Sequence, residues 1–98
     1  MDAVARDLIE RLAAKYVWWK TPEDAARTPD RVIARVMQLG DYADVQHLVA
    51  TLGDEHLRGV LRRADVGEFD ARSWTYWHYR LRLAEPGAVP PLPVRRTA

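Results

Sequence analysis

The sequence predicts an all-α fold: a single small bundle of about five helices over residues 1–85, followed by an extended proline-rich C-terminal tail over residues 86–98. Apolar residues recur every three or four positions in each long segment, and no stretch alternates as a strand does. The helix signals "TP" and "LGD" each occur twice. Beyond residue 85, four prolines remove backbone donors that a helix needs.

The first helix is predicted over residues 3 to about 20. One face of it carries the apolar residues Val4, Leu8, Ile9, Leu12, Tyr16 and Trp19, while Trp18 falls off this stripe. The Thr-Pro pairs then predict a short turn over 22–27 and a helix over 29–39, because Thr caps free N–H groups and Pro fits the first helical position.

The repeated "LGD" motif predicts two further helices, over 42–52 and 55–64. In each copy we expect Gly to end one helix in the left-handed conformation and Asp to cap the next. The apolar face of the first of these helices is predicted to hold Tyr42, Val45, Leu48, Val49 and Leu52. After a loop pinned by Phe69, Asp70 is predicted to cap a last helix over 71 to about 84.

The last helix is aromatic on two sides. Its predicted core face carries Trp74, Trp77, His78 and Leu81. Its opposite face carries Tyr76, Tyr79 and Leu83, bordered by Arg72, Arg80 and Arg82. A surface helix of a small monomer is usually polar on its outer face, so we expect something to cover this one.

Two covers for the second aromatic face remain open. One is the chain's own tail, through "VPPLPV", and the other is a partner protein, because Tyr, Trp and Arg dominate binding hot spots. The candidate partner-binding residues are therefore Tyr76, Tyr79, Arg80, Arg82, Leu83 and Trp18.

Composition argues against an enzyme. The chain has 98 residues, 48% of them hydrophobic and 30% charged, which is typical of one small globular domain. It has no cysteine, and His47, His56 and His78 lack metal-ligand spacing. No phosphate-binding glycine loop or nucleophile elbow occurs, so we expect no catalytic residue, metal or cofactor.

The charged N-terminal segment resembles neither a signal peptide nor a membrane span, and we expect a cytoplasmic protein.

DNA binding is the alternative function. The helices predicted over 42–52 and 55–64 have the outline of a helix-turn-helix, and the second would present Arg58, Arg62 and Arg63 to DNA. Against this stand a net charge of only +1, the solvent-facing position expected for Asp44 and an expected internal Glu55–Arg58 pair.

The aromatic motifs carry a family resemblance. From "KYVWW" to "RSWTYWHYRL" and "PPLP", residues 15–93 resemble small bacterial proteins with a domain of unknown function, commonly encoded just upstream of nucleotidyltransferase-type toxins of the abortive-infection kind. The resemblance implies an antitoxin-like protein that binds and neutralises the toxin from the neighbouring gene. It supplies no catalytic residues. A second copy of the chain, forming a homodimer, is a further partner to consider.

Overall fold

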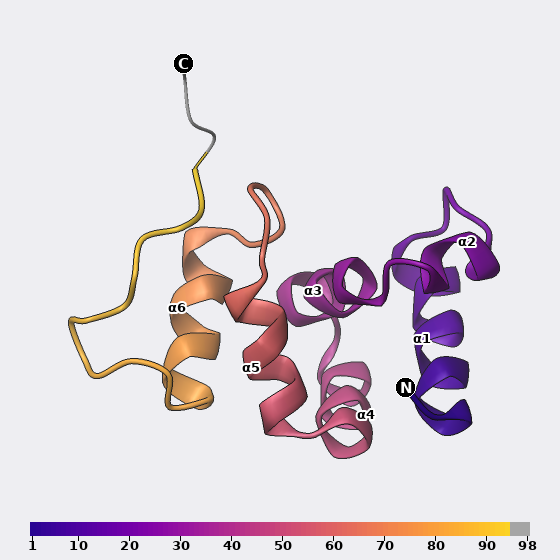
Figure 1. Cartoon of the computed structure of the whole chain (residues 1–98), viewed down its shortest axis with the longest axis horizontal. Coiled ribbons are helices and arrows are strands. Elements are labelled where there is room, and N and C mark those ends of the chain that lie inside the picture. The colour runs from indigo at the N-terminus through magenta and orange to yellow at the C-terminus, as the bar shows by residue number, and fades with distance from the viewer. Residues whose placement is uncertain (95–98) are drawn as a thin grey trace.

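The computed structural model describes residues 1–94, and within them the chain forms six helices and no strand (Figure 1). The helices are α1 (Ala3–Tyr16), α2 (Pro22–Ala26), α3 (Pro29–Leu39), α4 (Tyr42–Leu52), α5 (Asp54–Arg62) and α6 (Ala71–Arg80). The all-helical prediction is therefore confirmed for these residues, and the short turn predicted over 22–27 is α2.

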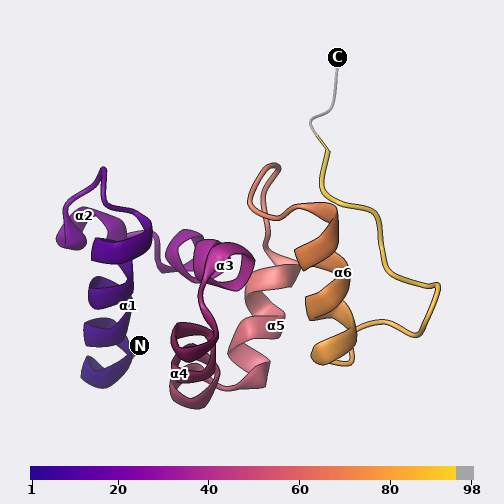
Figure 2. The same cartoon turned by 180° about the vertical axis from the view of Figure 1, so that it is seen from behind.

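Helix α3 is the centre of the arrangement. It packs against α1, α2, α4, α5 and α6, so that α1 with α2 lies at one end of the molecule and α6 at the other (Figures 1 and 2). The side chains of Val32, Ile33 and Val36 on α3 are almost completely buried. A central helix of this kind needs apolar residues on more than one side, and the successive pair Val32–Ile33 followed by Ala34 provides them.

Side-chain caps begin α1, α2, α4 and α6, and those of α2, α4 and α6 were predicted. Asp2, Asp41 and Asp70 each accept a hydrogen bond from the backbone N–H three residues later, at 2.8, 2.9 and 2.7 Å. Thr21 caps α2 in the same way. Thr28 does not cap α3, because its hydroxyl donates to the Ala25 carbonyl instead.

The two "LGD" motifs differ in conformation. Gly53 has φ +83° and is itself the N-cap of α5, so Asp54 is the first helical residue rather than the cap. Gly40 has φ −64°, in the extended region, so the left-handed glycine predicted there is wrong. Asp41 nevertheless caps α4. Its own backbone is extended, as that of an N-cap residue usually is, and its carboxylate accepts from the Asp44 N–H.

Helix α1 ends at Tyr16 and is shorter than the predicted span to about residue 20. Val17 leaves helical geometry and is buried, taking the position beside the core that the periodicity had given to Trp19. Trp18 and Trp19 consequently lie in the connection to α2, exposed by 74% and 53%. The predicted burial of Val4 is also wrong, since its side chain is 69% exposed in the first turn.

Helix α6 ends at Arg80, not near residue 84. Arg82 adopts a left-handed conformation with φ 57°, its N–H donates to the Tyr79 carbonyl at 3.1 Å, and the Leu83 N–H donates to the His78 carbonyl at 2.9 Å. This is a Schellman ending, in which the residue after the left-handed one folds back onto the last turn. Leu83 therefore packs on the His78 side of the helix.

The two indoles of α6 hold neighbouring segments through their N–H groups. Trp77 Nε1 donates to the Met37 carbonyl near the end of α3, at 2.8 Å. The usual helical donor to that carbonyl would be the Asp41 N–H, which instead donates to the Tyr16 hydroxyl. Trp74 Nε1 donates to the Pro90 carbonyl, also at 2.8 Å. The side chains of Trp74, Trp77, His78 and Leu81 are buried, which confirms the predicted core face.

In the described part of the chain, every helix is too short or too polar to cross a membrane.

Candidate functional site

The outer face of α6 exposes two tyrosines. Tyr76 and Tyr79 are 55% and 43% exposed, and their spacing of three residues places them next to each other on the helix. Tyr76 stands perpendicular to the buried Trp77 ring, with 5.3 Å between ring centroids. The core therefore fixes the base of this face, while the tyrosine rings themselves remain in solvent.

A groove separates α6 from the start of α4. Its volume is about 450 Å³, and Tyr42 on α4 and Tyr76 on α6 both line it, above Met37, Val45 and Trp77. Tyr42 is 80% exposed, although its spacing from Val45 predicted burial. Tyr42 directly follows the cap Asp41, and helical side chains tilt toward the N-terminus, so its ring extends past the helix end instead of onto the core.

Arginines flank this groove and face. Arg72 lines the groove, and the Arg80 guanidinium lies 5.5 Å from the Trp77 ring centroid. Within residues 1–94, neither guanidinium has a carboxylate within ion-pair distance, and the same holds for the exposed Arg82. We refer to Tyr42, Arg72, Tyr76, Tyr79 and Arg80 as the α6 surface.

Three of the predicted partner-binding residues do not belong to the α6 surface. Arg82 lies beyond the end of α6, in the left-handed conformation that turns the chain. Leu83 lines a different pocket, together with Trp74, His78 and Pro90, because the Schellman ending turns it away from the tyrosines. Trp18 follows α1, and α1 and α6 lie at opposite ends of the molecule (Figures 1 and 2). Of the predicted set, Tyr76, Tyr79 and Arg80 therefore lie together on the α6 surface, and the other members lie elsewhere.

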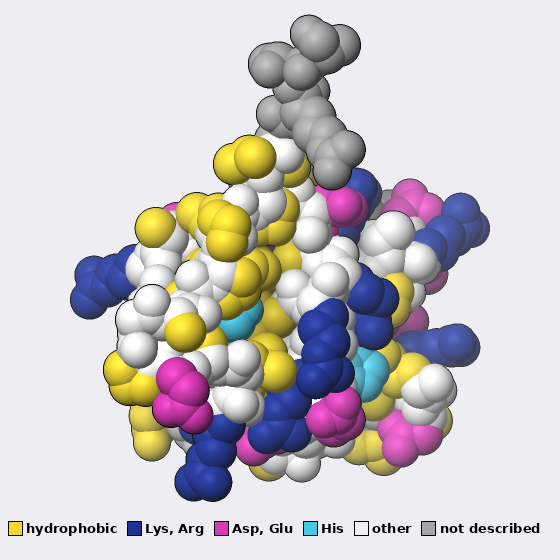
Figure 3. All heavy atoms as spheres, turned by 60° about the vertical axis from the view of Figure 1, so that its left-hand side comes forward, with side chains coloured by type: hydrophobic (Ala, Val, Ile, Leu, Met, Phe, Trp, Pro, Cys, Tyr) yellow, Lys and Arg dark blue, Asp and Glu magenta, His cyan; other side chains and the backbone are white. Residues whose placement is uncertain are grey.

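The segment after α6 packs beside Trp74 at the outer end of the molecule (Figures 1 and 2). The Pro90 carbonyl accepts from Trp74 Nε1, Val89 and Leu92 pack against the core, and the Gly87 N–H donates to the Tyr79 hydroxyl at 3.2 Å. Figure 3 shows hydrophobic side chains gathered on this side of the molecule. The segment leaves the Tyr76 and Tyr79 rings exposed. Residues 95–98 of the predicted tail lie outside the described residues.

The three arginines considered for DNA binding are engaged within the chain. Arg58 Nε donates to the Leu81 carbonyl at 2.8 Å, and its Nη1 pairs with Glu55 at 3.2 Å, which confirms the expected Glu55–Arg58 pair. Arg62 pairs with Glu55 at 3.1 Å and Arg63 with Asp30 at 2.8 Å. Hydrogen bonds from Arg58 and then Arg62 lower the pKa of Glu55, so this carboxylate stays ionised beside them.

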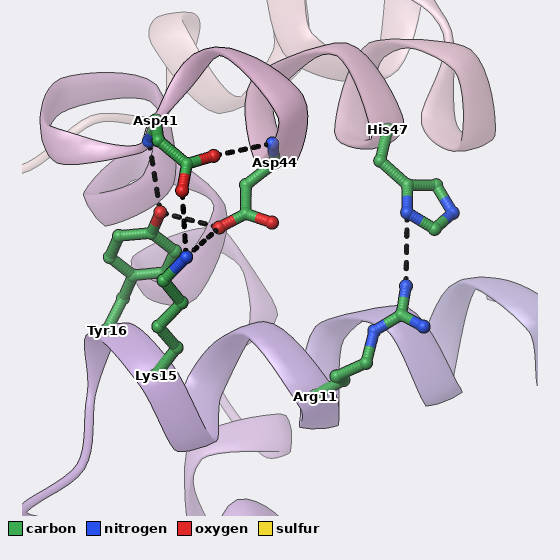
Figure 4. Close-up of polar contacts among 6 residues, drawn as sticks. All are labelled: Arg11, Lys15, Tyr16, Asp41, Asp44 and His47. Atoms are coloured by element: carbon green, nitrogen blue, oxygen red, sulfur yellow. Dashed lines mark hydrogen bonds and ion pairs between the residues drawn. The ribbon is translucent and has the colours of Figure 1, made fainter.

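A polar cluster joins α1 to the start of α4 (Figure 4). Lys15 Nζ lies 2.8 Å from a carboxylate oxygen of both Asp41 and Asp44, and the Tyr16 hydroxyl donates to Asp44 at 2.6 Å. Lys15 lowers the pKa of both aspartates, while the two carboxylates raise the pKa of Lys15. Burial raises the pKa of Tyr16. Asp44 was expected to face solvent, but this cluster leaves its side chain only 25% exposed.

The histidines are dispersed. His47 is exposed and its Nδ1 lies 3.1 Å from an Arg11 guanidinium nitrogen, His56 is half-buried, and His78 is buried with Nδ1 2.7 Å from the Trp74 carbonyl oxygen. Throughout residues 1–94, no three side chains of metal-ligating type gather into one group. The chemistry that the described surfaces offer is recognition through aromatic rings and arginines.

No family model, curated protein or solved structure matches this chain.

Proposed function

We propose that this chain is a protein-interaction module of the antitoxin type, which binds and neutralises a nucleotidyltransferase-type toxin through the α6 surface. The observation that carries the proposal is the pairing of three exposed tyrosine rings with arginines that have no carboxylate partner in residues 1–94. The partner class rests on the family resemblance of the aromatic motifs.

The α6 surface has the composition of a binding hot spot. Tyrosine buries a large area while losing little conformational freedom, and arginine adds directional donors. The groove between Tyr42 and Tyr76 has room for partner side chains, and its base is rigid because Trp77 is anchored to Met37. A surface that is ordered before binding loses less entropy when the partner arrives.

The test is a neutralisation experiment with the product of the neighbouring gene. We expect the wild-type chain to co-purify with it and to relieve its growth arrest. Tyr42→Ala combined with Tyr76→Ala should weaken the complex by about 30-fold or more, as loss of two hot-spot residues does. Neither phenol makes a hydrogen bond within residues 1–94, so the variant should stay folded.

Trp18→Ala is the matched control, because it removes an exposed aromatic ring at the other end of the molecule. We expect it to neutralise the toxin as well as the wild type does. A double tyrosine variant that still neutralises fully, or the absence of any complex, would refute the proposal.

DNA binding remains the alternative, with less support. Arg58, Arg62 and Arg63 would have to exchange their bonds to Glu55, Leu81 and Asp30 for phosphate contacts. Retarded migration of its own promoter fragment, lost in Arg58→Ala with Arg62→Ala and weakened steeply by salt, would favour this alternative.

A further inference from the structure

A second surface of aromatic and basic residues lies at the other end of the molecule from α6. Trp18 and Trp19 are 74% and 53% exposed, and their rings meet edge to face at 5.7 Å. A short surface connection does not need two tryptophans for its own packing, because Val17 already fills the adjacent core position. Two neighbouring exposed indoles form an apolar patch of the kind that marks interaction sites.

A cavity of about 320 Å³ opens beside Trp19. It lies between the α1–α2 connection, α3 and the loop after α5. Its apolar part is formed by Val17, Ala25, Val32 and Ala34, whose side chains are buried. Trp19 forms one wall, and the cations Lys20, Arg31 and Arg35 also line the cavity. A cavity of this volume can hold one large apolar side chain of a peptide and part of the residues on either side of it, but it is too small for a helix or a hairpin.

The cations at this cavity are free of internal ion pairs. Within residues 1–94, Lys20, Arg31 and Arg35 have no carboxylate within 4.0 Å. Arg35 is nevertheless held in place, because its Nε donates to the Tyr16 carbonyl at 3.2 Å and its guanidinium carbon lies 5.0 Å from the Trp19 ring centroid. Among residues 1–94 its other guanidinium N–H groups have no hydrogen-bond partner, so they can donate to a ligand.

Two carboxylates also line the cavity, Asp65 and Glu68. Glu68 turns into the protein: one oxygen accepts from the Asp65 N–H at 3.2 Å and the other is buried without a partner. Burial raises the pKa of Glu68. The cavity therefore presents three cations against one solvent-exposed carboxylate, Asp65, and it favours a ligand that carries negative charge.

We propose that this second surface, Trp18, Trp19, Lys20, Arg31 and Arg35, binds an acidic peptide segment of a second partner protein, distinct from the toxin. The segment inserts one large apolar side chain into the cavity beside Trp19, and its carboxylates pair with the three cations. A peptide is favoured over single-stranded nucleic acid because its neutral backbone offers N–H groups that Asp65 can accept from, whereas every nucleotide adds a phosphate that Asp65 repels. A net charge of +1 also supplies little long-range attraction for a strand charged at every position.

The test is a subtractive selection from a phage-displayed library of random dodecapeptides. The library is first depleted on the Trp19→Ala variant of the full chain and then selected on the wild type. We expect the enriched peptides to carry at least two Asp or Glu residues flanking a Leu, Ile, Met or Phe. Enrichment of basic or uncharged peptides, or no enrichment above background, overturns the proposal.

Charge-removal variants then locate the binding by fluorescence anisotropy of a labelled enriched peptide. Lys20→Ala with Arg31→Ala should weaken the affinity by about tenfold or more, as loss of two close charge contacts does. Arg72→Ala with Arg80→Ala removes the same charge from the α6 surface and should change the affinity by less than about twofold. Equal losses in both pairs would show a non-specific charge effect and overturn the proposal.

A competition experiment distinguishes peptide binding from binding of single-stranded nucleic acid at this surface. If oligo(dT) of twelve nucleotides displaces the peptide at lower concentration than the unlabelled peptide itself, the surface is a nucleic-acid site and the proposal fails. Should Trp19→Ala unfold, Lys20→Glu with Arg31→Glu replaces it in the depletion step, since both side chains are exposed. The result is independent of toxin neutralisation, because all three altered residues lie outside the α6 surface.

Discussion

Arg82 is the one non-glycine residue with positive φ among residues 1–94. Its left-handed conformation ends α6 and turns Leu83 back onto the helix, at a steric cost that glycine would not pay. We expect Arg82→Gly to raise the free energy of unfolding by about 0.5–1 kcal/mol. Urea unfolding measures this change. Arg80→Gly is the control: it lies in the last helical turn and should destabilise instead, so two variants with the same sign would contradict the interpretation.

Trp77 combines apolar burial with one directed hydrogen bond. Its side chain is 1% exposed, and Nε1 donates to the Met37 carbonyl, which lacks its usual helical donor. Trp77→Phe keeps an aromatic ring but leaves that carbonyl unsatisfied and a small cavity, so we expect a loss of about 2–4 kcal/mol in unfolding free energy. Trp18→Phe should change it by less than about 0.5 kcal/mol. Equal melting temperatures for wild type and Trp77→Phe would show that the bond contributes nothing.

At the scale of the helices, the sequence predicted most starts and missed several ends. The caps Asp41 and Asp70 were recognisable because Asp precedes an apolar-periodic stretch. The ends of α1 and α6 were not, since neither Val17 nor Arg82 is a residue that usually terminates a helix. Both ends affect the candidate sites. Because α1 ends at Tyr16, Trp18 and Trp19 lie on the surface, and because α6 ends at Arg80, Leu83 does not share a face with Tyr76 and Tyr79.

The contact between α1 and α4 gives a prediction about acid stability. Lys15 lowers the pKa of Asp41 and Asp44 in the folded chain, so their ionised forms stabilise it above the unfolded pKa of about 3.9. That contribution is lost as the pH falls through their lowered folded pKa. We expect the unfolding free energy of Lys15→Met to fall less than that of the wild type between pH 5 and pH 2, because without Lys15 the folded-state pKa of the two aspartates lies closer to the unfolded value.

Urea unfolding at several pH values measures this difference. Lys20→Met is the control, because Lys20 has no carboxylate within 4.0 Å in residues 1–94 and its acid limb should follow the wild type. Parallel acid limbs for wild type and Lys15→Met would mean that the cluster in Figure 4 does not couple to folding.

At the scale of the whole molecule, the central α3 separates two surfaces of similar composition. Helix α6 lies at one end and the α1–α2 connection, with Trp18 and Trp19, at the other (Figures 1 and 2). Each of the two surfaces has exposed aromatic rings beside cations that have no carboxylate within 4.0 Å in residues 1–94. The sequence did not predict that these are two separate surfaces. Periodicity shows which residues share a face of one helix, but it does not show where that helix packs relative to α3. The pairing of the arginines was predicted only in part: the expected Glu55–Arg58 pair is present, whereas the pairs of Arg62 with Glu55 and of Arg63 with Asp30 were not predicted.

The segment after α6 tests how the α6 surface depends on the rest of the molecule. Deleting residues 86–98 removes the Pro90 acceptor of Trp74 and the packing of Val89 and Leu92 against the core. We expect the unfolding free energy to fall by about 2–3 kcal/mol, from the Trp74–Pro90 hydrogen bond, the exposed hydrogen bond from Gly87 to Tyr79 and two half-buried apolar side chains. Because the segment leaves Tyr42 and Tyr76 uncovered, partner affinity measured below the new melting temperature should stay within about threefold of the wild type.

A chain that ends at Val94 retains these contacts and is the control. Unchanged stability would mean that the segment does not support Trp74, whereas lost affinity in a folded deletion variant would mean that it forms part of the partner site.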